Sequence, residues 1–222
     1  MAKIDKIKKK TSGRQKPGIQ SIPPGRLKIS EALKILLKEK NFDAITWAEI
    51  AEMAGVNEAL IYKYFGDKRN LLHAVLKEYL SECTPLLRQS LQDVEGVLEK
   101  IRVFIHVSLS RYLELGVLAR ILIVEVRTFP GYFQSGTYEE IRNYSDILLK
   151  IIEDGVREGK IRNDIPPRLI RQMILGTMEY MCLPMVLFKQ KLDPDEVTDQ
   201  ICKFVFSGIK IQKVKKRPMV SK

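Results

Sequence analysis

The sequence predicts an all-α protein with a three-helix N-terminal helix-turn-helix domain and a larger helical bundle behind it. Apolar residues recur at helical spacing from about residue 27 to residue 210, and no segment alternates with a period of two over a useful length. Glycine and proline interrupt this pattern at helix-length intervals, at Gly116, Pro130, Gly159, Pro166 and Pro194.

The positive charge of the chain is concentrated towards its two ends. The 222 residues carry a formal net charge of +11. Residues 1–79 hold 16 Lys+Arg against 9 Asp+Glu (+7), residues 80–208 hold 16 against 18 (−2), and residues 209–222 hold 6 against 0 (+6). A basic N-terminal region beside a near-neutral remainder suits one module that binds a polyanion and another that binds something else.

Several function classes find no support in the sequence. Only two histidines are present, and there is no HExxH motif, glycine-rich phosphate loop or ligand cluster, so we expect no enzyme, metal site or cofactor. Cys83, Cys182 and Cys202 are widely spaced, which favours buried free thiols in a reducing cytosol over a redox switch. The apolar stretch 173–188 is too short and too polar to cross a membrane, and no secretory signal is expected. We therefore expect a cytoplasmic protein.

Residues 1–25 are rich in lysine, glycine and proline and lack a hydrophobic period, which predicts a flexible basic arm. This arm could contact DNA phosphates or the minor groove, or it could only aid solubility. Residues 211–222 are expected to form a basic C-terminal tail.

Residues 26–79 read as the helix-turn-helix domain. A helix over residues 27–40 carries one apolar stripe, and Thr46 with Glu49 forms a capping box at the start of a second helix. That helix turns Ile50, Ala51 and Met53 inward and ends at Gly55, which suits the left-handed C-cap.

A third helix, capped by Asn57, carries the expected contact surface. Ile61 and Phe65 are four residues apart and face the core, which turns other side chains outward. These outward residues are Glu58, Ala59, Tyr62 and Lys63. Phenols and an ammonium on one short face suit phosphate oxygens, although the aromatic rings could simply pack the small domain.

Residues 26–75 resemble the DNA-binding signature of the TetR family of bacterial transcription regulators. The resemblance is carried by Ala54-Gly55-Val56, by Tyr62-Lys63-Tyr64-Phe65 and by Lys68. It implies that Thr46, Tyr62 and Lys68 hold DNA phosphates, and that Glu58, Ala59 and Lys63 lie near base edges. The complete set of candidate DNA-binding residues is Thr46, Trp47, Asn57, Glu58, Ala59, Leu60, Tyr62, Lys63, Tyr64 and Lys68.

The sequence departs from the family pattern at two positions. Asn41 stands where the first helix usually ends with glycine, although asparagine also tolerates left-handed geometry. Leu60 stands where a small hydroxyl residue is common, which could favour contact with a thymine methyl group.

Residues 80–210 are expected to form the bundle. A helix that starts at Asp67 should end or kink near Thr84, because Pro85 follows. Further helices are expected over residues 86–95, 97–114, 117–128, 136–158, 167–190 and 194–210.

The last two helices are the expected dimer interface. Operator recognition by a helix-turn-helix normally uses a twofold dimer, and the helix over residues 167–190 is apolar on almost every side. TetR-like dimers typically join through these helices. The candidate interface residues are Met178, Met181, Val197, Ile201 and Phe204.

The middle of the bundle is expected to surround a cavity for an unknown, hydrophobic small-molecule effector. The indication is polar side chains set inside apolar runs, which must be paired, neutralised or aimed at a ligand. The candidates are His106, Arg120, Glu125, Met178 and Glu179. Mutual salt bridges explain the charged candidates at least as well, and methionine suits core packing equally.

The resulting hypothesis is a TetR-like repressor that binds a palindromic double-stranded operator as a homodimer and is released by its effector. Two other interpretations stay open: a protein that coats DNA without regard to sequence, and a dimeric scaffold whose head no longer binds DNA.

Overall fold

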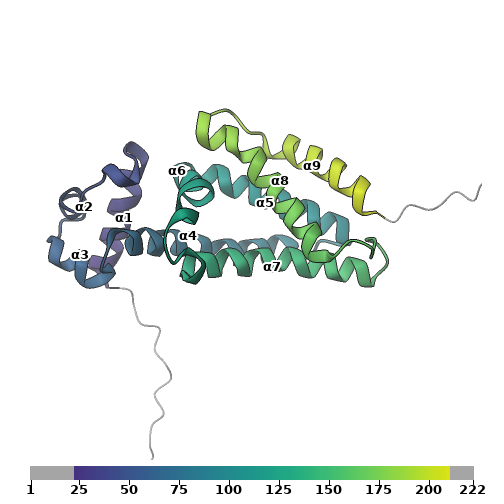
Figure 1. Ribbon diagram of the computed structural model, residues 1–222, viewed down its shortest axis with the longest axis horizontal. Helices are drawn as coiled ribbons and strands as arrows, with labels where there is room; N and C mark the ends of the chain where they lie inside the picture. The colour runs from purple at the N-terminus through teal and green to yellow at the C-terminus, as the bar shows by residue number, and fades with distance from the viewer. Residues whose placement is uncertain (1–22, 211–222) are drawn as a thin grey trace, which may run out of the picture.

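The computed structural model describes residues 23–210, and within that range the chain is helical without a named strand. The N-terminal helices are α1 (Pro24–Glu39), α2 (Trp47–Ala54), α3 (Glu58–Phe65) and α4 (Lys68–Leu91). The bundle adds α5 (Val97–Leu115), α6 (Val117–Arg120), α7 (Gly136–Arg157), α8 (Pro167–Phe188) and α9 (Pro194–Ile209). The molecule is elongated, with α1–α3 as a head at one end and the bundle at the other (Figure 1). The all-α prediction is confirmed.

Local chemistry fixes the head as expected. The Thr46 hydroxyl accepts from the Glu49 amide at 3.3 Å while the Glu49 carboxylate accepts from the Thr46 amide at 2.8 Å, which completes the capping box. Gly55 ends α2 with φ +64°, a left-handed conformation that favours glycine. Met53 was expected to face the core but is 47% exposed, because α2 buries Ile50, Ala51 and Ala54 instead.

The start and end of α1 differ from the expectation. The helix begins at Pro24, so its first two residues belong to the region predicted as a flexible arm; proline is well suited to the first helical position. Asn41 follows the helix at φ −67°, not in the left-handed region, because Lys40 leaves the helix in an extended conformation. The remainder of the predicted arm and the predicted tail over residues 211–222 lie outside the described residues.

The fourth helix does not stop near Thr84 but continues through Pro85 to Leu91. Pro85 removes one backbone hydrogen bond, yet Cys83 and Leu87 on either side of it are buried in the bundle and hold the helix against its neighbours. The separate helix expected over residues 86–95 is therefore the last part of α4. Figure 1 shows α4 passing from the head along α7.

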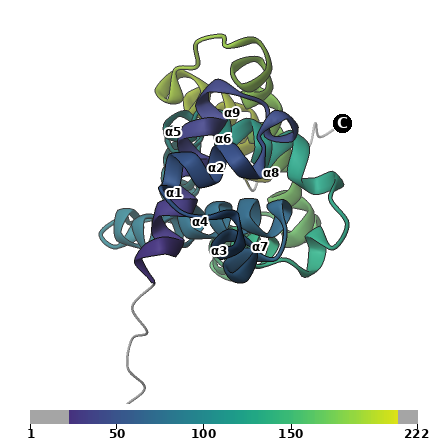
Figure 2. The ribbon, with the colours of Figure 1, turned by 90° about the vertical axis from the view of Figure 1, so that its left-hand side faces the viewer.

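The remaining helices follow the predicted segments closely, with one irregularity. In the bundle, α7 packs on α4, α5 and α8, and α9 packs on α5 and α8. The segment predicted as one helix over residues 117–128 is broken into α6, a π-helical turn over Ile121–Glu125 and a 3-10 turn over Val126–Thr128. In Figure 2 the head faces the viewer, with α3 at its outer surface.

Two hydrophobic cores stabilise the molecule, and their boundary does not fall at residue 79. One core joins the head to the first half of α4 and to residues of α6 and the turns after it, including Leu118, Ile121, Leu122 and Val126. The second fills the far end of the bundle around Phe104. The head is thus packed onto the bundle rather than tethered to it.

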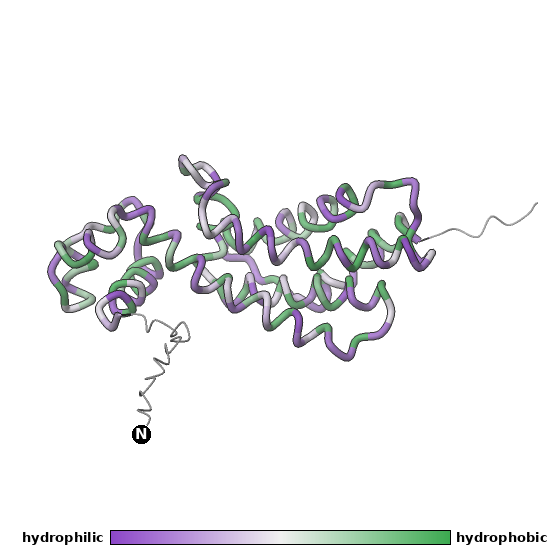
Figure 3. Tube along the Cα trace, turned by 90° about the horizontal axis from the view of Figure 1, so that it is seen from below, coloured by the Kyte–Doolittle hydropathy of each residue, from purple (hydrophilic) through white to green (hydrophobic). Residues whose placement is uncertain are grey.

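Each helix carries both hydrophobic and hydrophilic residues, as the hydropathy-coloured trace shows (Figure 3). Among the residues described, no helix combines the length and the apolar character that a membrane crossing requires.

Candidate functional site

The outer surface of the head is formed by α3. Glu58, Ala59, Tyr62 and Lys63 are exposed, whereas Ile61 is fully buried. This is the orientation that the spacing of Ile61 and Phe65 predicts. The Asn57 side chain accepts from the Leu60 amide at 2.8 Å and so fixes the N-terminus of α3.

The N-terminus of α2 lies beside this surface. The Trp47 and Tyr62 rings are 4.9 Å apart between centroids, which holds the Tyr62 phenol at the junction of the two helices. Lys40 forms an ion pair with Glu49, and together with the capping hydrogen bonds from Thr46 it lowers the pKa of the Glu49 carboxyl to about 2. Thr46, Trp47 and Tyr62 therefore form a continuous edge next to the exposed face of α3.

Leu60 and Tyr64 do not share the exposed face. Both are half-buried, and a Cβ placed on Gly25 would lie 3.2 Å from Leu60 and 3.4 Å from Tyr64. The two side chains thus pack against the first turn of α1. Leu60 and Tyr64 share this packing role because residues four apart lie on one side of a helix, and their contacts with DNA stay predictions.

Lys68 also has a different role from the one expected. Its ammonium group donates to the backbone carbonyls of Phe42 at 3.0 Å, Ile45 at 2.8 Å and Asp43 at 3.3 Å, and lies over the Phe42 ring. These contacts tie the start of α4 to the turn before α2. In this structure Lys68 is a structural residue rather than a free phosphate donor.

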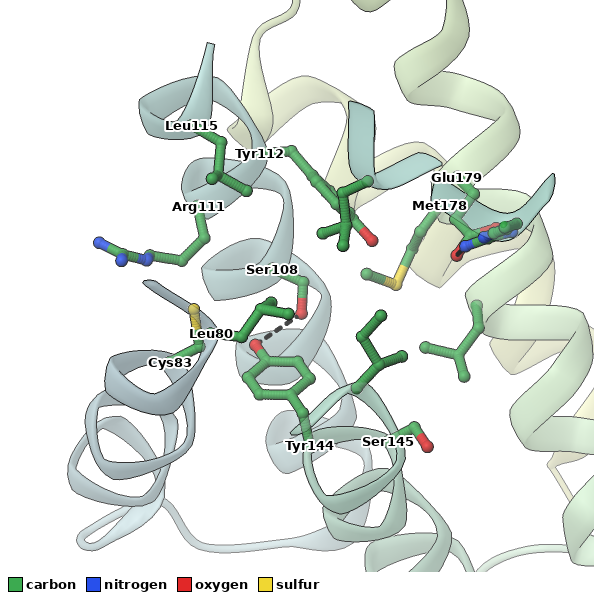
Figure 4. A pocket seen from close by; sticks show the side chains of 14 residues that line it. Leu80, Cys83, Ser108, Arg111, Tyr112, Leu115, Tyr144, Ser145, Met178 and Glu179 are labelled. Atoms are coloured by element: carbon green, nitrogen blue, oxygen red, sulfur yellow. Dashed lines mark hydrogen bonds and ion pairs between the residues drawn. The ribbon is translucent and has the colours of Figure 1, made fainter. Parts of the chain in front are cut away.

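A cavity of about 90 Å³ lies in the bundle between α4, α5, α7 and α8, next to the π-helical segment (Figure 4). Of the five predicted effector residues, only Met178 and Glu179 line it. The main apolar lining comes from Leu80, Leu115, Leu122, Ile141, Leu175 and Met178.

The polar lining is mostly paired internally. Ser108 donates to the Phe104 carbonyl at 2.7 Å, and its oxygen lies 2.9 Å from the Tyr144 hydroxyl, which donates to it. Arg127 and Glu179 form a bidentate pair with distances of 2.9 and 2.5 Å. Sequence reasoning missed Ser108 and Tyr112, although their spacing of four on an apolar helix indicates two hydroxyls on one inward face.

His106, Arg120 and Glu125 do not reach the cavity. His106 on α5 is partly exposed, and its Nε2 lies 2.9 Å from Asp195 on α9. Arg120 lies 3.2 Å from Glu125 and donates to the Asn41 side chain of the head at 3.0 Å. Each of these polar groups is therefore satisfied by a protein partner, as the alternative interpretation held.

Phe129 joins the cavity wall to the head. It follows Arg127 by two residues, and its ring lies 6.1 Å from Phe42 and 6.2 Å from His73 between centroids. The Arg69 guanidinium lies 5.0 Å from the same ring. Phe129 therefore contacts the head only two residues after Arg127, which lines the cavity.

The predicted dimer residues are divided between core and surface. Met178 and Ile201 are only 2% and 3% exposed and belong to the core of their own bundle, so they are not available to a partner. Met181 and Val197 are half-buried, whereas Phe204 is 69% exposed. Prediction from apolar character alone could not separate the two sides of such a uniformly apolar helix.

Comparison with known proteins identifies the family of the chain. Residues 29–75 match the family described as bacterial regulatory proteins of the tetR family. Residues 74–208, more than half of the chain, match the C-terminal region of YsiA-like proteins, a TetR-type domain. The chain belongs to the TetR family of transcriptional regulators. The resemblance seen in the helix-turn-helix is thereby confirmed, and so is the expectation that the protein is not an enzyme, because members of this family are regulators.

The individual relatives share low sequence identity with this chain, but the alignments span nearly the whole length of each relative. The chain is 26% identical to the fatty acid metabolism regulator protein of Bacillus subtilis, over 84% of this chain and 96% of the relative. The crystal structure of the B. subtilis regulator FadR in complex with stearoyl-CoA aligns with a TM-score of 0.74, at 26% identity, over 82% of this chain and 98% of that one. FadR from Bacillus halodurans aligns with a TM-score of 0.75 at 22% identity, over 85% and 98%.

Proposed function

We propose that this TetR family member is a cytoplasmic repressor that binds a palindromic operator as a homodimer and is released by a hydrophobic effector. The observation that carries the DNA-binding part is the exposed face of α3, defined by Glu58, Ala59, Tyr62 and Lys63. Tyr62 and Lys63 would hold phosphates or read base edges, and Glu58 would accept from cytosine N4 in the major groove.

Genomic footprinting with the purified protein tests this part. A regulator protects discrete palindromic sites, and a palindrome should compete better than random DNA of equal length. Uniform protection would instead support the protein that coats DNA, and no binding at low ionic strength would support the scaffold.

Substitutions on α3 would sharpen the test. K63A should weaken operator binding about tenfold, the loss of roughly one charged contact. E58Q should change the preferred base. The control K150A removes one exposed charge from α7, away from this face, and should leave the affinity nearly unchanged.

The proposal of a dimer is supported by an apolar surface on α8 and α9. Met173, Tyr180 and Phe204 are 58%, 73% and 69% exposed. Nothing lies within 4 Å of a Cβ placed on Gly176 or Gly208, although glycine weakens a helix interior. Close approach of a second copy would account for both features.

The oligomeric state tests the dimer. Y180E with F204E should give monomers with a native circular dichroism spectrum, since both side chains are exposed and their loss creates no cavity. Operator affinity should fall together with dimerisation. A dimer that survives both changes would move the interface elsewhere.

The effector part of the proposal is supported by the bundle cavity and by the relative whose crystal structure contains stearoyl-CoA. Since an engineered cavity of about 150 Å³ holds benzene, the present cavity of about 90 Å³ cannot hold a long acyl chain until its helices separate. A ligand that binds only the separated arrangement would shift the population towards it and away from the form that fits the operator. Titration of the protein–operator complex with stearoyl-CoA and with shorter apolar compounds measures this release.

A further inference from the structure

The Tyr112 hydroxyl has no hydrogen-bond partner among the described residues, and the Nε of Arg111, which also lines the bundle cavity, has none either. The cavity is that described above between α4, α5, α7 and α8, and Figure 4 shows the Tyr112 hydroxyl directed into it beside Met178. No hydrogen bond joins this hydroxyl to any of the residues that the structure describes, whereas the neighbouring Tyr144 hydroxyl is bonded to Ser108 at 2.9 Å. Tyr112 is partly buried, and its unpaired hydroxyl can donate a hydrogen bond to a ligand that enters the cavity.

The Tyr112 phenol is a neutral donor. Burial raises its pKa well above the ordinary range, with the Glu179 carboxylate adding to the effect. The group therefore keeps its proton at physiological pH and offers an O–H to an acceptor.

The charges around the cavity cancel. Arg127 and Glu179 pair with each other in bidentate geometry, which satisfies both groups. The Arg111 side chain lines the wall, but its guanidinium lies 4.5 Å from the Tyr79 ring and pairs with Glu114, and Figure 4 shows it directed away from the interior. An anionic ligand would have to displace Glu179 and a cationic ligand would have to displace Arg127, and either would leave a charge without its partner.

We propose that this cavity takes the uncharged, apolar part of a ligand that carries a carbonyl-type oxygen, and that Tyr112 donates a hydrogen bond to that oxygen. Met178, which is flexible and lies beside the hydroxyl, adapts the wall to the ligand. The inference rests on the proposed effector-responsive function and adds to it the chemistry that the effector presents inside the bundle.

Four probes of nearly equal shape test the proposal on the full-length wild-type protein. Acetone offers a neutral acceptor, isobutane offers none, acetate is an anion and acetamidine is a cation, and all four are small enough for a cavity of about 90 Å³. Ligand-observed NMR titration gives their dissociation constants without any DNA present. We expect acetone to bind Y112F about fivefold more weakly than the wild type, the effect of one net hydrogen bond, and both charged probes to bind the wild type more weakly than acetone.

Two variants assign the effect to one hydroxyl. Y112F should weaken the binding of acetone and leave the affinity for isobutane unchanged, and the difference in hydration between the two probes cancels from this comparison. Y144F is the matched control: it removes a hydroxyl whose proton is already given to Ser108, so the affinity for acetone should remain that of the wild type. Thermal unfolding of both variants shows whether the fold is kept, and the comparison of probes on the wild type does not depend on either variant.

The affinities of the probes for the wild type and for Y112F decide whether the inference holds. Binding of neither acetone nor isobutane to the wild-type protein overturns the inference, and so does tightest binding of acetate or acetamidine. An affinity for acetone that is the same in Y112F as in the wild type also overturns it. Genomic footprinting needs no ligand and tests the regulatory function independently. Failure of the proposed Tyr112 hydrogen bond can therefore be distinguished from failure of the proposed regulatory function.

Discussion

Phe129 of the bundle packs against Phe42 of the head, with 6.1 Å between the ring centroids. Phe129 stands two residues after Arg127, whose ion pair with Glu179 forms part of the cavity wall. One short turn thus touches both the cavity and the segment that precedes the helix-turn-helix, and we propose Phe129 as the point that couples the two.

The first prediction concerns this coupling. F129A should reduce the release of operator by effector several-fold, because the head would no longer follow the turn. The half-buried ring should also contribute roughly 2 kcal/mol to the free energy of unfolding, less than the cost of truncating a fully buried phenylalanine. Operator release and urea unfolding measure the two effects. F133A is the control, since Phe133 is 67% exposed and, within residues 23–210, its ring stacks on Tyr132 and Tyr138 and not on the head; an equal loss of release in F133A would contradict the role of Phe129.

The second prediction separates two lysines of the head. K68M should lower the free energy of unfolding by about 1–3 kcal/mol, because it leaves carbonyl groups of residues 42–45 without their charged donor. K63M should leave stability within about 0.5 kcal/mol of wild type, as expected for an exposed residue, but should weaken operator binding. Chemical denaturation and DNA binding of both variants provide the comparison. Unchanged stability in K68M would return Lys68 to the list of free phosphate donors.

The third prediction is a pH dependence at the junction of head and bundle. The Thr137 hydroxyl donates to the His73 carbonyl at 3.2 Å, and the His73 Nδ1 lies 2.9 Å from the same hydroxyl oxygen. Burial lowers the pKa of His73, while the Asp67 charge partly opposes this. Below about pH 6.5 the unfolded chain therefore binds a proton that the folded chain does not, and stability falls as pH falls. The melting temperature should decline between pH 7 and pH 5.5, and H73N should flatten this slope. A slope that is the same in H73N would assign it to another group.

The fourth prediction concerns Gly155 in α7. A Cβ at this position would lie 2.6 Å from Val97 and 2.8 Å from Ile161. G155A should therefore destabilise the bundle by about 1–3 kcal/mol through overpacking, even though alanine favours a helix. The double variant G155A/V97A, which removes the nearest methyl group, should recover part of that loss in urea unfolding. Additive losses in the double variant would show that Val97 is not the source of the strain.

The thiols were predictable from sequence in kind but not in environment. Cys83, Cys182 and Cys202 are free and buried, as their spacing and apolar context indicated. Burial raises the pKa of the Cys182 thiol to about 12 and that of Cys202 to about 11, which leaves little reactive thiolate at neutral pH.

Short-range chemistry made the head predictable. The capping box at Thr46, the glycine at position 55 and the inward spacing of Ile61 and Phe65 act within a few residues, so the sequence alone located α2 and α3 and the exposed side of α3. The roles of Leu60 and Lys68 were not predictable, because their partners are the first turn of α1 and the carbonyls of residues 42–45, more than 20 residues away.

The cavity was harder to predict for the same reason. A charged residue in an apolar run indicates a need for a partner but not which partner, and the choice between a ligand and a salt bridge depends on how the helices pack. His106 meets Asp195 from a distant helix, whereas the Tyr112 hydroxyl has no hydrogen-bond partner among the described residues. Only the packed bundle distinguishes the two cases.

The shared hydrophobic core of the head and the start of the bundle has a consequence for how this chain can be dissected. Excision of residues 23–79 would strip apolar cover from Leu33, Phe42 and Leu72, which lie in the same core as Leu118 and Val126. The isolated fragment would therefore not keep the stability of the full-length protein. A chimera that joined this DNA-binding domain to the bundle of another protein would need apolar side chains at the same positions of the new interface.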